Sequence, residues 1–174
     1  LGDVYKRQMF RWAPPELAME WDNVGLLVGR GDREVRRVLV ALDVSPDVAA
    51  EAAETGADLI VSHHPVMNIR WHAQQMQTLR EDTRLGGLLT ELVKRDISAV
   101  CMHTNLDAAE GGVNEVLAGI FDMKNMETFA EGCGRVGSIE PITVPQLACK
   151  AQQELAAHCN ACLLYTSDAA DDTP

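Results

Sequence analysis

Apolar and polar residues alternate along this chain in the pattern of a protein built from both strands and helices. Four runs rich in Val, Leu and Ile are predicted to be β-strands, at residues 26–28, 37–44, 58–62 and 97–102. Residues 47–55 and 84–95 instead repeat apolar side chains at helical spacing. The segment 37–64 is a strand–helix–strand unit, which implies parallel strands and a right-handed crossover. We predict an α/β fold with a parallel-rich sheet flanked by helices, in which both faces of the strand at 37–44 are covered.

Turn and capping residues mark the ends of these elements. Ser45 is a predicted N-cap, Pro46 suits the first turn of a helix, and Gly56 is a predicted C-cap. The remaining predicted elements are helices at 15–19, 113–121 and 143–158, and weaker strands at 128–130 and 135–140. Residues 66–83 lack a clean period and are predicted to form a loop with some helical character beside a functional site.

The apolar run at 58–62 ends in two adjacent histidines, His63 and His64, and then in Pro65, which cannot continue a sheet ladder. Ligands bind at the carboxyl ends of parallel strands, so two imidazoles there are candidate metal ligands. Neighbouring strand residues point to opposite faces, so the pair shares one metal only if the chain bends. Otherwise each imidazole faces a different ion of a close pair. The alternative is that one histidine packs and the other is solvated.

The next predicted strand ends in His103 and Asp107. Sequential parallel strands are commonly neighbours with their carboxyl ends on one edge, so these two residues can converge with His63 and His64. Imidazole with carboxylate suits Zn²⁺, Mn²⁺, Fe²⁺ or Ni²⁺ rather than Ca²⁺. A divalent ion lowers the pKa of bound water from ~15.7 to ~7, so such a site is typical of hydrolytic chemistry.

Two further carboxylates have more than one interpretation. Asp43 either orients a histidine or places a charge at the N-terminus of the next helix. Glu110 is either a base or a solvated turn residue. About three or four ligands serve one metal and two metals need more, so the site is either mononuclear or completed by residues beyond this sequence.

The composition and net charge of the chain exclude some classes of binding partner. The chain has 174 residues, a length that suits one domain or slightly more, and its net charge is −11. An acidic surface repels nucleic acids and anionic membranes, and no run approaches the ~20 apolar residues of a membrane span. Five scattered cysteines indicate a reducing compartment, and Cys159 and Cys162 have redox or zinc spacing but no second pair. We predict a cytoplasmic protein that binds neither nucleic acid nor membrane.

Both ends of the chain look foreign to the rest. Residues 1–8 and 163–174 resemble translated sequencing-adapter read-through, and neither shows a strand or helix period that joins to its neighbour. We therefore predict that these two segments are artefacts. The remainder is predicted to divide into a first α/β lobe at 9–125, which carries the site, and a partial second lobe at 126–162.

Four segments together resemble the NIF-three-like dinuclear metal-centre family, also described as the GTP cyclohydrolase 1 type 2 family. They are PELAMEWDNVGLLVG at 15–29, VLVALDV at 38–44, ADLIVSHHP at 57–65 and ISAVCMHTNLDAAEGG at 97–112. The segment GCGRVG at 132–137 also fits. The resemblance covers residues 9 to about 161, and the motifs are highly specific in this order and spacing.

The resemblance implies a two-lobed fold that assembles as a toroidal homohexamer around interior two-metal sites. The implied metal ligands are His63, His64 and Asp107, and His103 lines the pocket as the implied catalytic residue. The family also uses a His and a Glu from a later motif, which this chain does not contain. We therefore expect an incomplete second lobe with an uncovered apolar sheet face, weak metal affinity and no activity from this chain alone.

Two functions remain open at this point. The first is a metal-dependent hydrolase that acts on a nucleotide or a similar phosphorylated heterocycle, with Trp21 and Trp71 as the residues able to stack a base. The second is a non-enzymatic metal-binding scaffold or regulatory partner protein. No P-loop or GxGxxG motif is present to favour the nucleotide.

Overall fold

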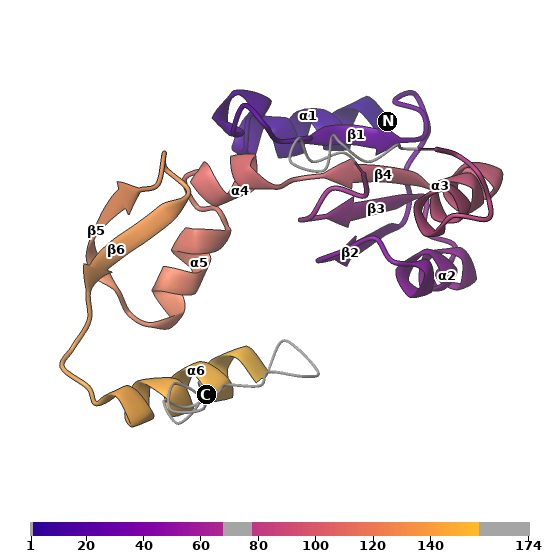
Figure 1. Cartoon of the computed structure of the whole chain (residues 1–174). Coiled ribbons are helices and arrows are strands. Elements are labelled where there is room, and N and C mark those ends of the chain that lie inside the picture. Colours follow the sequence, from indigo (N-terminus) through magenta and orange to yellow (C-terminus); the bar gives the residue numbers. More distant parts are fainter. Residues whose placement is uncertain (1, 68–77, 157–174) are drawn as a thin grey trace.

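The computed structural model describes residues 2–67 and 78–156, and its centre is a four-stranded sheet (Figure 1). The strand order is β1 (Gly25–Val28), β4 (Ser98–Cys101), β3 (Leu59–Ser62) and β2 (Val38–Ala41). The strands β2, β3 and β4 run parallel, and β1 is antiparallel to β4. The predicted α/β fold with a parallel-rich sheet is therefore confirmed.

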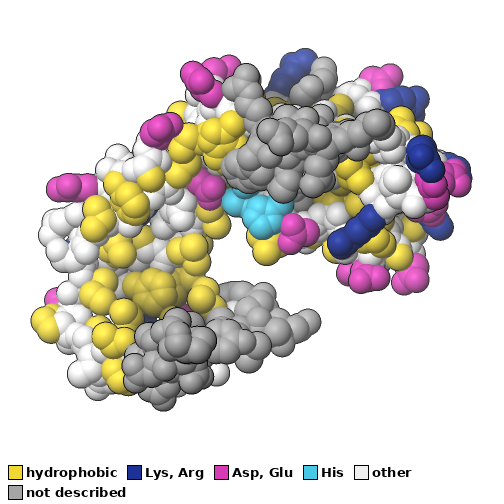
Figure 2. Space-filling view, viewed as in Figure 1, with side chains coloured by type: hydrophobic (Ala, Val, Ile, Leu, Met, Phe, Trp, Pro, Cys, Tyr) yellow, Lys and Arg dark blue, Asp and Glu magenta, His cyan; other side chains and the backbone are white. Residues whose placement is uncertain are grey.

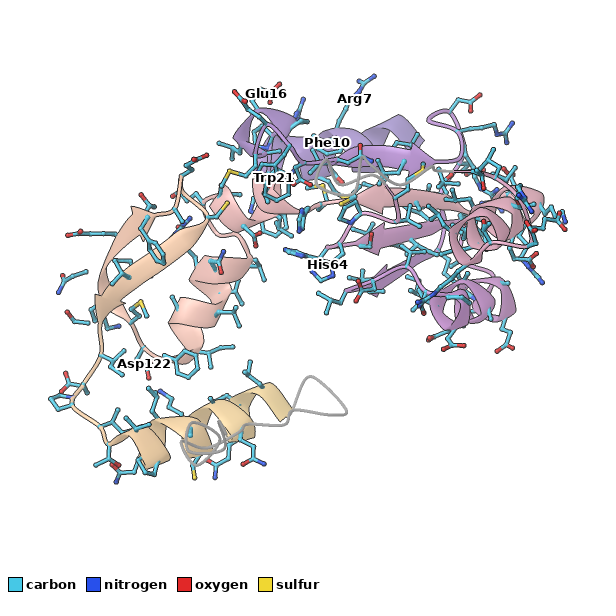
Figure 3. All side chains as sticks on the ribbon, in the orientation of Figure 1. Arg7, Phe10, Glu16, Trp21, His64 and Asp122 are labelled. Atoms are coloured by element: carbon cyan, nitrogen blue, oxygen red, sulfur yellow. The ribbon has the colours of Figure 1, made fainter. Side chains whose placement is uncertain are left out.

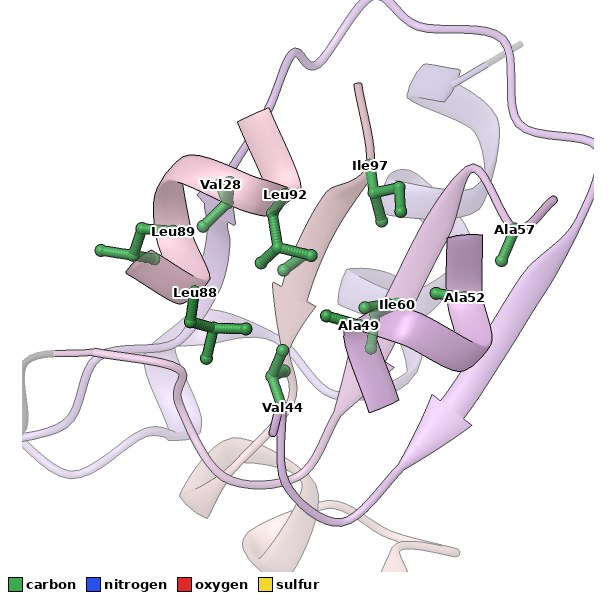
Figure 4. Close-up of a cluster of buried hydrophobic side chains, with 11 residues drawn as sticks. Val28, Val44, Ala49, Ala52, Ala57, Ile60, Leu88, Leu89, Leu92 and Ile97 are labelled. Carbon is green, nitrogen blue, oxygen red and sulfur yellow. The ribbon is translucent and has the colours of Figure 1, made fainter. Parts of the chain in front are cut away.

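One face of the sheet is covered by the two amphipathic helices α2 (Pro46–Thr55) and α3 (Arg84–Lys94) (Figure 1). The apolar sides of both helices pack on Ile60, which points to this face of the sheet (Figure 4). Ala99 of β4 belongs to the same cluster. The hydroxyl of Ser45 caps α2 by accepting a bond from the Val48 N–H at 3.2 Å, and Gly56 ends it in the left-handed conformation. The sequence signals for this helix are thus confirmed.

The opposite face of the sheet carries a second apolar cluster. Leu59 and Val100 point to this face because strand side chains alternate, and they pack with Met9 and Phe10 of α1 (Gly2–Trp12). A 3₁₀ turn follows at Pro15–Leu17. The helix α1 runs without a break across residues 8 and 9, so the expectation that no helical period joins the first eight residues to the rest is wrong. Their adapter origin stays a prediction, and residues 163–174 lie outside the described residues.

The strand β2 differs from its prediction. It is shorter than 37–44, and it lies at the edge of the sheet, where Val38 is 42% and Val40 is 78% exposed. The expectation of cover on both faces is wrong, because α1 packs over β1, β3 and β4 and none of the described elements covers this side of β2. An apolar run shows that a strand favours burial, but it does not show whether another element of the fold covers that strand.

Beyond the sheet, the chain continues into a one-turn helix α4 (Thr104–Ala108), a helix α5 (Val113–Ile120) and a two-stranded antiparallel sheet. That sheet pairs β5 (Lys124–Phe129) with β6 (Gly134–Ser138), and α6 (Val144–Ala156) follows. The buried guanidinium of Arg135 ties β6 to this region. It pairs with Glu115 at 3.1 Å and donates to the carbonyls of Ala108 and Ala109. The division into lobes at residue 125 stays a prediction.

At the amino ends of β2 and β3, Asp58 holds the loop that leads into the sheet. Its carboxylate accepts bonds from the Arg36 N–H at 2.8 Å, from the Arg33 guanidinium at 2.9 Å and from the Arg37 N–H at 3.0 Å. These bonds stabilise the charged form, so the pKa of Asp58 lies below its ordinary value of 3.8. A lowered pKa means that the carboxylate stabilises the folded chain above pH 3.8, and that this stabilisation is lost as the pH falls through the folded pKa.

We therefore expect Asp58→Asn to be less stable than the unsubstituted chain at neutral pH, with the difference shrinking as the pH falls to about 3. Urea unfolding at several pH values measures both chains. An equal difference in unfolding free energy at every pH would contradict an ionised role for Asp58.

Candidate metal centre

The strand order places a row of titratable side chains along one edge of the sheet. Asp43 follows β2, His63 and His64 follow β3, and His103 follows β4, so all four stand at carboxyl ends of parallel strands. Asp22 precedes β1, which is antiparallel and therefore begins at the same edge. His64 extends beyond the end of the sheet in Figure 3. The edge thus collects three imidazoles with carboxylates on both sides of them.

The chain bends at the histidine pair, which is the condition under which both imidazoles could share one metal. The buried hydroxyl of Ser62 donates to the carbonyl of His64 at 2.8 Å, which turns the backbone directly after β3. The carbonyl of His63 accepts from the Cys101 thiol at 3.1 Å. Both imidazoles consequently lie on the same side, with their ring centroids 5.3 Å apart.

His103 completes a triangle of rings. Its centroid is 5.1 Å from that of His63 and 5.6 Å from that of His64, and one ligand atom from each ring lies within 4.8 Å of the others. Figure 2 shows the histidine side chains at the surface of the hollow between the sheet and α5, beside acidic and apolar side chains. This separation is short enough for a single ion or a close pair of ions to contact all three imidazoles.

Asp107 reaches the same centre from α4. His103 is the N-cap of this helix and Asp107 lies one turn later, so the two side chains share a helix face. The carboxylate of Asp107 lies 3.1 Å from Nε2 of His63, and the amide of Asn114 donates to it at 3.4 Å. The structure thus brings Asp107 together with His63. The sequence pattern did not predict α4, because five residues are too few for a helical period.

Each histidine has a carboxylate on one ring nitrogen. His63 pairs with Asp107, His64 pairs through Nδ1 with Asp43 at 2.7 Å, and His103 pairs through Nδ1 with Asp22 at 2.9 Å. At His64 and His103, the carboxylate on Nδ1 fixes the ring and leaves Nε2 for a metal, which is the usual arrangement around metal-binding histidines. Asp107, which contacts Nε2 of His63, is itself a candidate ligand. For Asp43, this contact matches the interpretation that it orients a histidine. Glu110 is exposed, as a solvated turn residue is.

The donor set suits a divalent metal. Three imidazoles and one carboxylate are nitrogen and oxygen donors of the kind that Zn²⁺, Mn²⁺, Fe²⁺ and Ni²⁺ accept. Nδ1 of His63 is buried and has no hydrogen-bond partner, an arrangement that is costly for a polar atom unless something binds there. Burial raises the pKa of the Cys101 thiol to about 12, and this thiol donates its hydrogen to the carbonyl of His63.

A cavity of about 470 Å³ adjoins the histidines on the uncovered side of β2. Its walls are mainly apolar, with Val40 and Val61 from the sheet, Leu42 directly after β2 and Leu117 from α5. Its polar residues include His63 and Asp107. Among the described residues that line it there is no Lys or Arg, so a phosphate group here would need a metal ion as its counter-charge. Of the two tryptophans predicted to stack a base, Trp21 packs edge-on beside His103 at 6.1 Å, and Trp71 lies outside the described residues.

Asp22 is the residue that the sequence analysis missed. It lies in the segment PELAMEWDNVGLLVG at 15–29, and its side chain is fully buried and contacts His103. The signal that could have found it is the pairing of β1 with β4, in which Gly25 lies opposite Cys101 and the chain before β1 therefore runs beside the chain after β4. Burial raises the pKa of Asp22, but hydrogen bonds from Thr104, His103 and Asn23 outweigh it, so the pKa is lowered overall.

The fold and the site define an α/β protein with a three-histidine, carboxylate-flanked centre at the carboxyl edge of its parallel strands. The chain belongs to the Duf34/NIF3 (NGG1p interacting factor 3) family, whose model matches residues 3–171. The family resemblance inferred from the sequence motifs is therefore confirmed.

Relatives and solved structures agree with this assignment. The chain is 40% identical over 124 residues to a GTP cyclohydrolase 1 type 2 homolog of Halalkalibacterium halodurans, an alignment that covers 71% of this chain and 32% of the relative. It is 37% identical over 154 residues to the homolog of Streptomyces coelicolor, covering 83% of this chain and 52% of that protein. Its fold matches reduced HcgD from Methanocaldococcus jannaschii with a TM-score of 0.77 at 28% identity, covering 87% of this chain and 59% of that chain.

The chain thus spans about a third to a half of these two relatives. Within residues 2–67 and 78–156, every helix is too short or too polar to cross a bilayer.

Proposed function

We propose that the protein binds divalent metal ions through His63, His64 and Asp107 and acts as a metal-dependent hydrolase on a nucleotide-like substrate. The observation that carries this proposal is the convergence of three imidazoles and one carboxylate at the carboxyl edge of the sheet. The shared family and the name of the relatives, GTP cyclohydrolase 1 type 2 homolog, support the substrate class. The cavity beside the histidines is within the ~300–1,000 Å³ range of small-molecule sites.

The residues divide into distinct roles. A divalent ion, when bound, supplies Lewis acidity toward a substrate oxygen or a water molecule. His63, His64 and Asp107 would hold that ion, and Asp43 and Asn114 would orient two of these side chains. His103, whose Nδ1 contacts Asp22, would accept or return a proton at Nε2. The apolar wall formed by Val61 and Leu117 would take the uncharged ring of a substrate.

The homohexamer implied by the family resemblance is part of the same proposal. Exposed apolar side chains support further association of this chain, including Val40 and Leu42 beside β2 and Phe129 and Val136 on the two-stranded sheet. Light scattering of the longer relatives and of this chain tests the assembly.

Metal binding is tested by titrating the metal-free chain with Zn²⁺ and Mn²⁺ in a calorimeter, with Asp107→Asn as the test variant. We expect measurable binding by the unsubstituted chain and an affinity lower by roughly 10–100-fold or more in Asp107→Asn, because the amide replaces a charged ligand by a neutral one. Glu110→Gln is the matched control, since it removes an exposed carboxylate from the same region and should bind as the unsubstituted chain does. Equal affinities in all three chains would contradict the proposed ligand role.

Hydrolysis is tested separately with a full-length relative loaded with each divalent ion and supplied with GTP and other nucleotides. Turnover that depends on the metal supports the hydrolase. Metal binding without turnover on any nucleotide would instead favour a non-enzymatic scaffold.

A further inference from the structure

We propose that Asp22 is a positioning residue that sets the tautomer of His103, so that Nδ1 carries the proton and Nε2 presents its lone pair to the metal centre. This inference deepens the proposed function and rests on it for its purpose. The direct evidence is the hydrogen-bond network around the Asp22 carboxylate, which does not depend on a metal.

The carboxylate of Asp22 is fully buried, and each of its oxygens lies within hydrogen-bond distance of two groups. One oxygen accepts from the Asn23 N–H at 2.7 Å and faces Nδ1 of His103 at 2.9 Å. The other accepts from the Thr104 N–H at 3.1 Å and from the Thr104 hydroxyl. The Thr104 hydroxyl in turn accepts from the Met19 N–H at 3.0 Å, so its own hydrogen is directed at Asp22.

This network leaves one consistent placement of hydrogens. Two of the four donors are backbone N–H groups, which cannot reverse, and an ionised carboxylate only accepts. Nδ1 of His103 must therefore donate, which leaves Nε2 without a hydrogen in the neutral ring. Asp22 acts through His103, because its carboxylate contacts Nδ1 of this ring and the ring is one of the three whose ligand atoms lie within 4.8 Å of one another.

The contact of Asp43 with His64 offers a natural contrast within the same centre. That pair has a similar geometry, with 2.7 Å between Oδ1 and Nδ1, but its carboxylate is 64% exposed and the imidazole 45% exposed. Water can replace Asp43 as the partner of His64, whereas no water reaches the fully buried carboxylate of Asp22. The positioning effect should therefore be strong at His103 and weak at His64.

The substitution Asp22→Asn separates positioning from packing, because Asn has nearly the same shape. Its amide oxygen is expected to stay with the two donors of Thr104, which turns the NH₂ group toward Nδ1 of His103 and leaves the Asn23 N–H without its acceptor. Nδ1 must then accept, so the hydrogen moves to Nε2 and the lone pair is lost from the side that faces the centre.

The experiment is a long-range ¹H–¹⁵N NMR spectrum of the metal-free chain at a pH where the rings are neutral. We expect the Nδ1–H form of His103 in the unsubstituted chain, the Nε2–H form in Asp22→Asn, and an unchanged His103 in Asp43→Asn. An Nε2–H form of His103 in the unsubstituted chain would overturn the inference, and this spectrum decides the question even if Asp22→Asn does not fold. A folded Asp22→Asn chain, checked by urea unfolding, with His103 unchanged would also overturn it.

A zinc titration of the unsubstituted chain keeps the two proposals distinguishable. Absence of zinc binding with the Nδ1–H form of His103 present would contradict the proposed metal centre and leave the role of Asp22 intact. Zinc binding with the Nε2–H form would do the reverse.

Discussion

The substitution His64→Ala is expected to lower the affinity of the chain for Zn²⁺ by at least about 100-fold. The imidazole of His64 lies in the triangle with His63 and His103, so its removal takes away one of the nitrogen donors. Loss of a residue that merely supports a ligand costs about 10–100-fold, and loss of a ligand itself should cost more. Calorimetric titration of the metal-free chains with Zn²⁺ measures the ratio.

This variant separates binding from folding. The side chain of His64 is 45% exposed, so its truncation should change the free energy of unfolding by only about 0.5 kcal/mol. His158→Ala is the matched control, because it removes a histidine that belongs to no predicted ligand set. If His64→Ala binds zinc as tightly as His158→Ala does, the histidine centre is not the metal site.

The largest loss of stability near the centre is expected from Asn105→Ala, at roughly 2–5 kcal/mol. The side chain of Asn105 is fully buried and joins two segments of backbone. Its oxygen accepts from the N–H of His103 at 2.9 Å, and its nitrogen donates to the carbonyl of Ala13 at 2.8 Å. Truncation leaves both backbone groups buried without a partner and opens a cavity, and each unsatisfied group costs about 1–3 kcal/mol. Urea unfolding gives the difference in free energy.

Two further variants serve as comparisons for Asn105→Ala. Asn105→Asp keeps the size and the acceptor for His103 but sets an oxygen against the carbonyl of Ala13, so it should also be strongly destabilised. Gln152→Ala removes an exposed amide from α6 and should stay within about 0.5 kcal/mol of the unsubstituted chain. A loss of less than about 1 kcal/mol in Asn105→Ala would show that the two backbone groups find other partners.

Much of the centre was predictable because its residues stand at the ends of strands. The apolar runs before His63 and before His103 identify two parallel neighbours, and parallel neighbours end on the same edge. For Asp107, the sequence predicted only that the residue lies near this edge of the sheet. Its contact with His63 depends on α4, which is one turn long, and on Asn114 of α5, which also holds the carbonyl of Cys133 before β6.

The contact between Asp22 and His103 could not be predicted from the sequence. A residue that lies outside the helices and strands, 81 positions before its partner, has no periodicity that points to a site. Its position beside His103 depends on the antiparallel pairing of β1 with β4. The sequence of neither strand alone predicts this pairing, because β1 is short and β4 is distant along the chain. The exposed side of β2 is a second case, because the apolar run of β2 resembles that of β3 in the sequence although Val38 and Val40 are exposed.

The sequence by itself determined the four strands of the sheet, the helices α2 and α3 on one face of it, the caps of α2, the parallel order of β2, β3 and β4, and the imidazoles at the strand ends. Only the tertiary structure decided that the three histidines face one another and that each receives a carboxylate. It also decided that one side of β2 is left uncovered. The physical reason is that periodicity and capping are local properties of a few residues, whereas the meeting of side chains depends on strand register, on a bend stabilised by Ser62 and on the packing of distant elements.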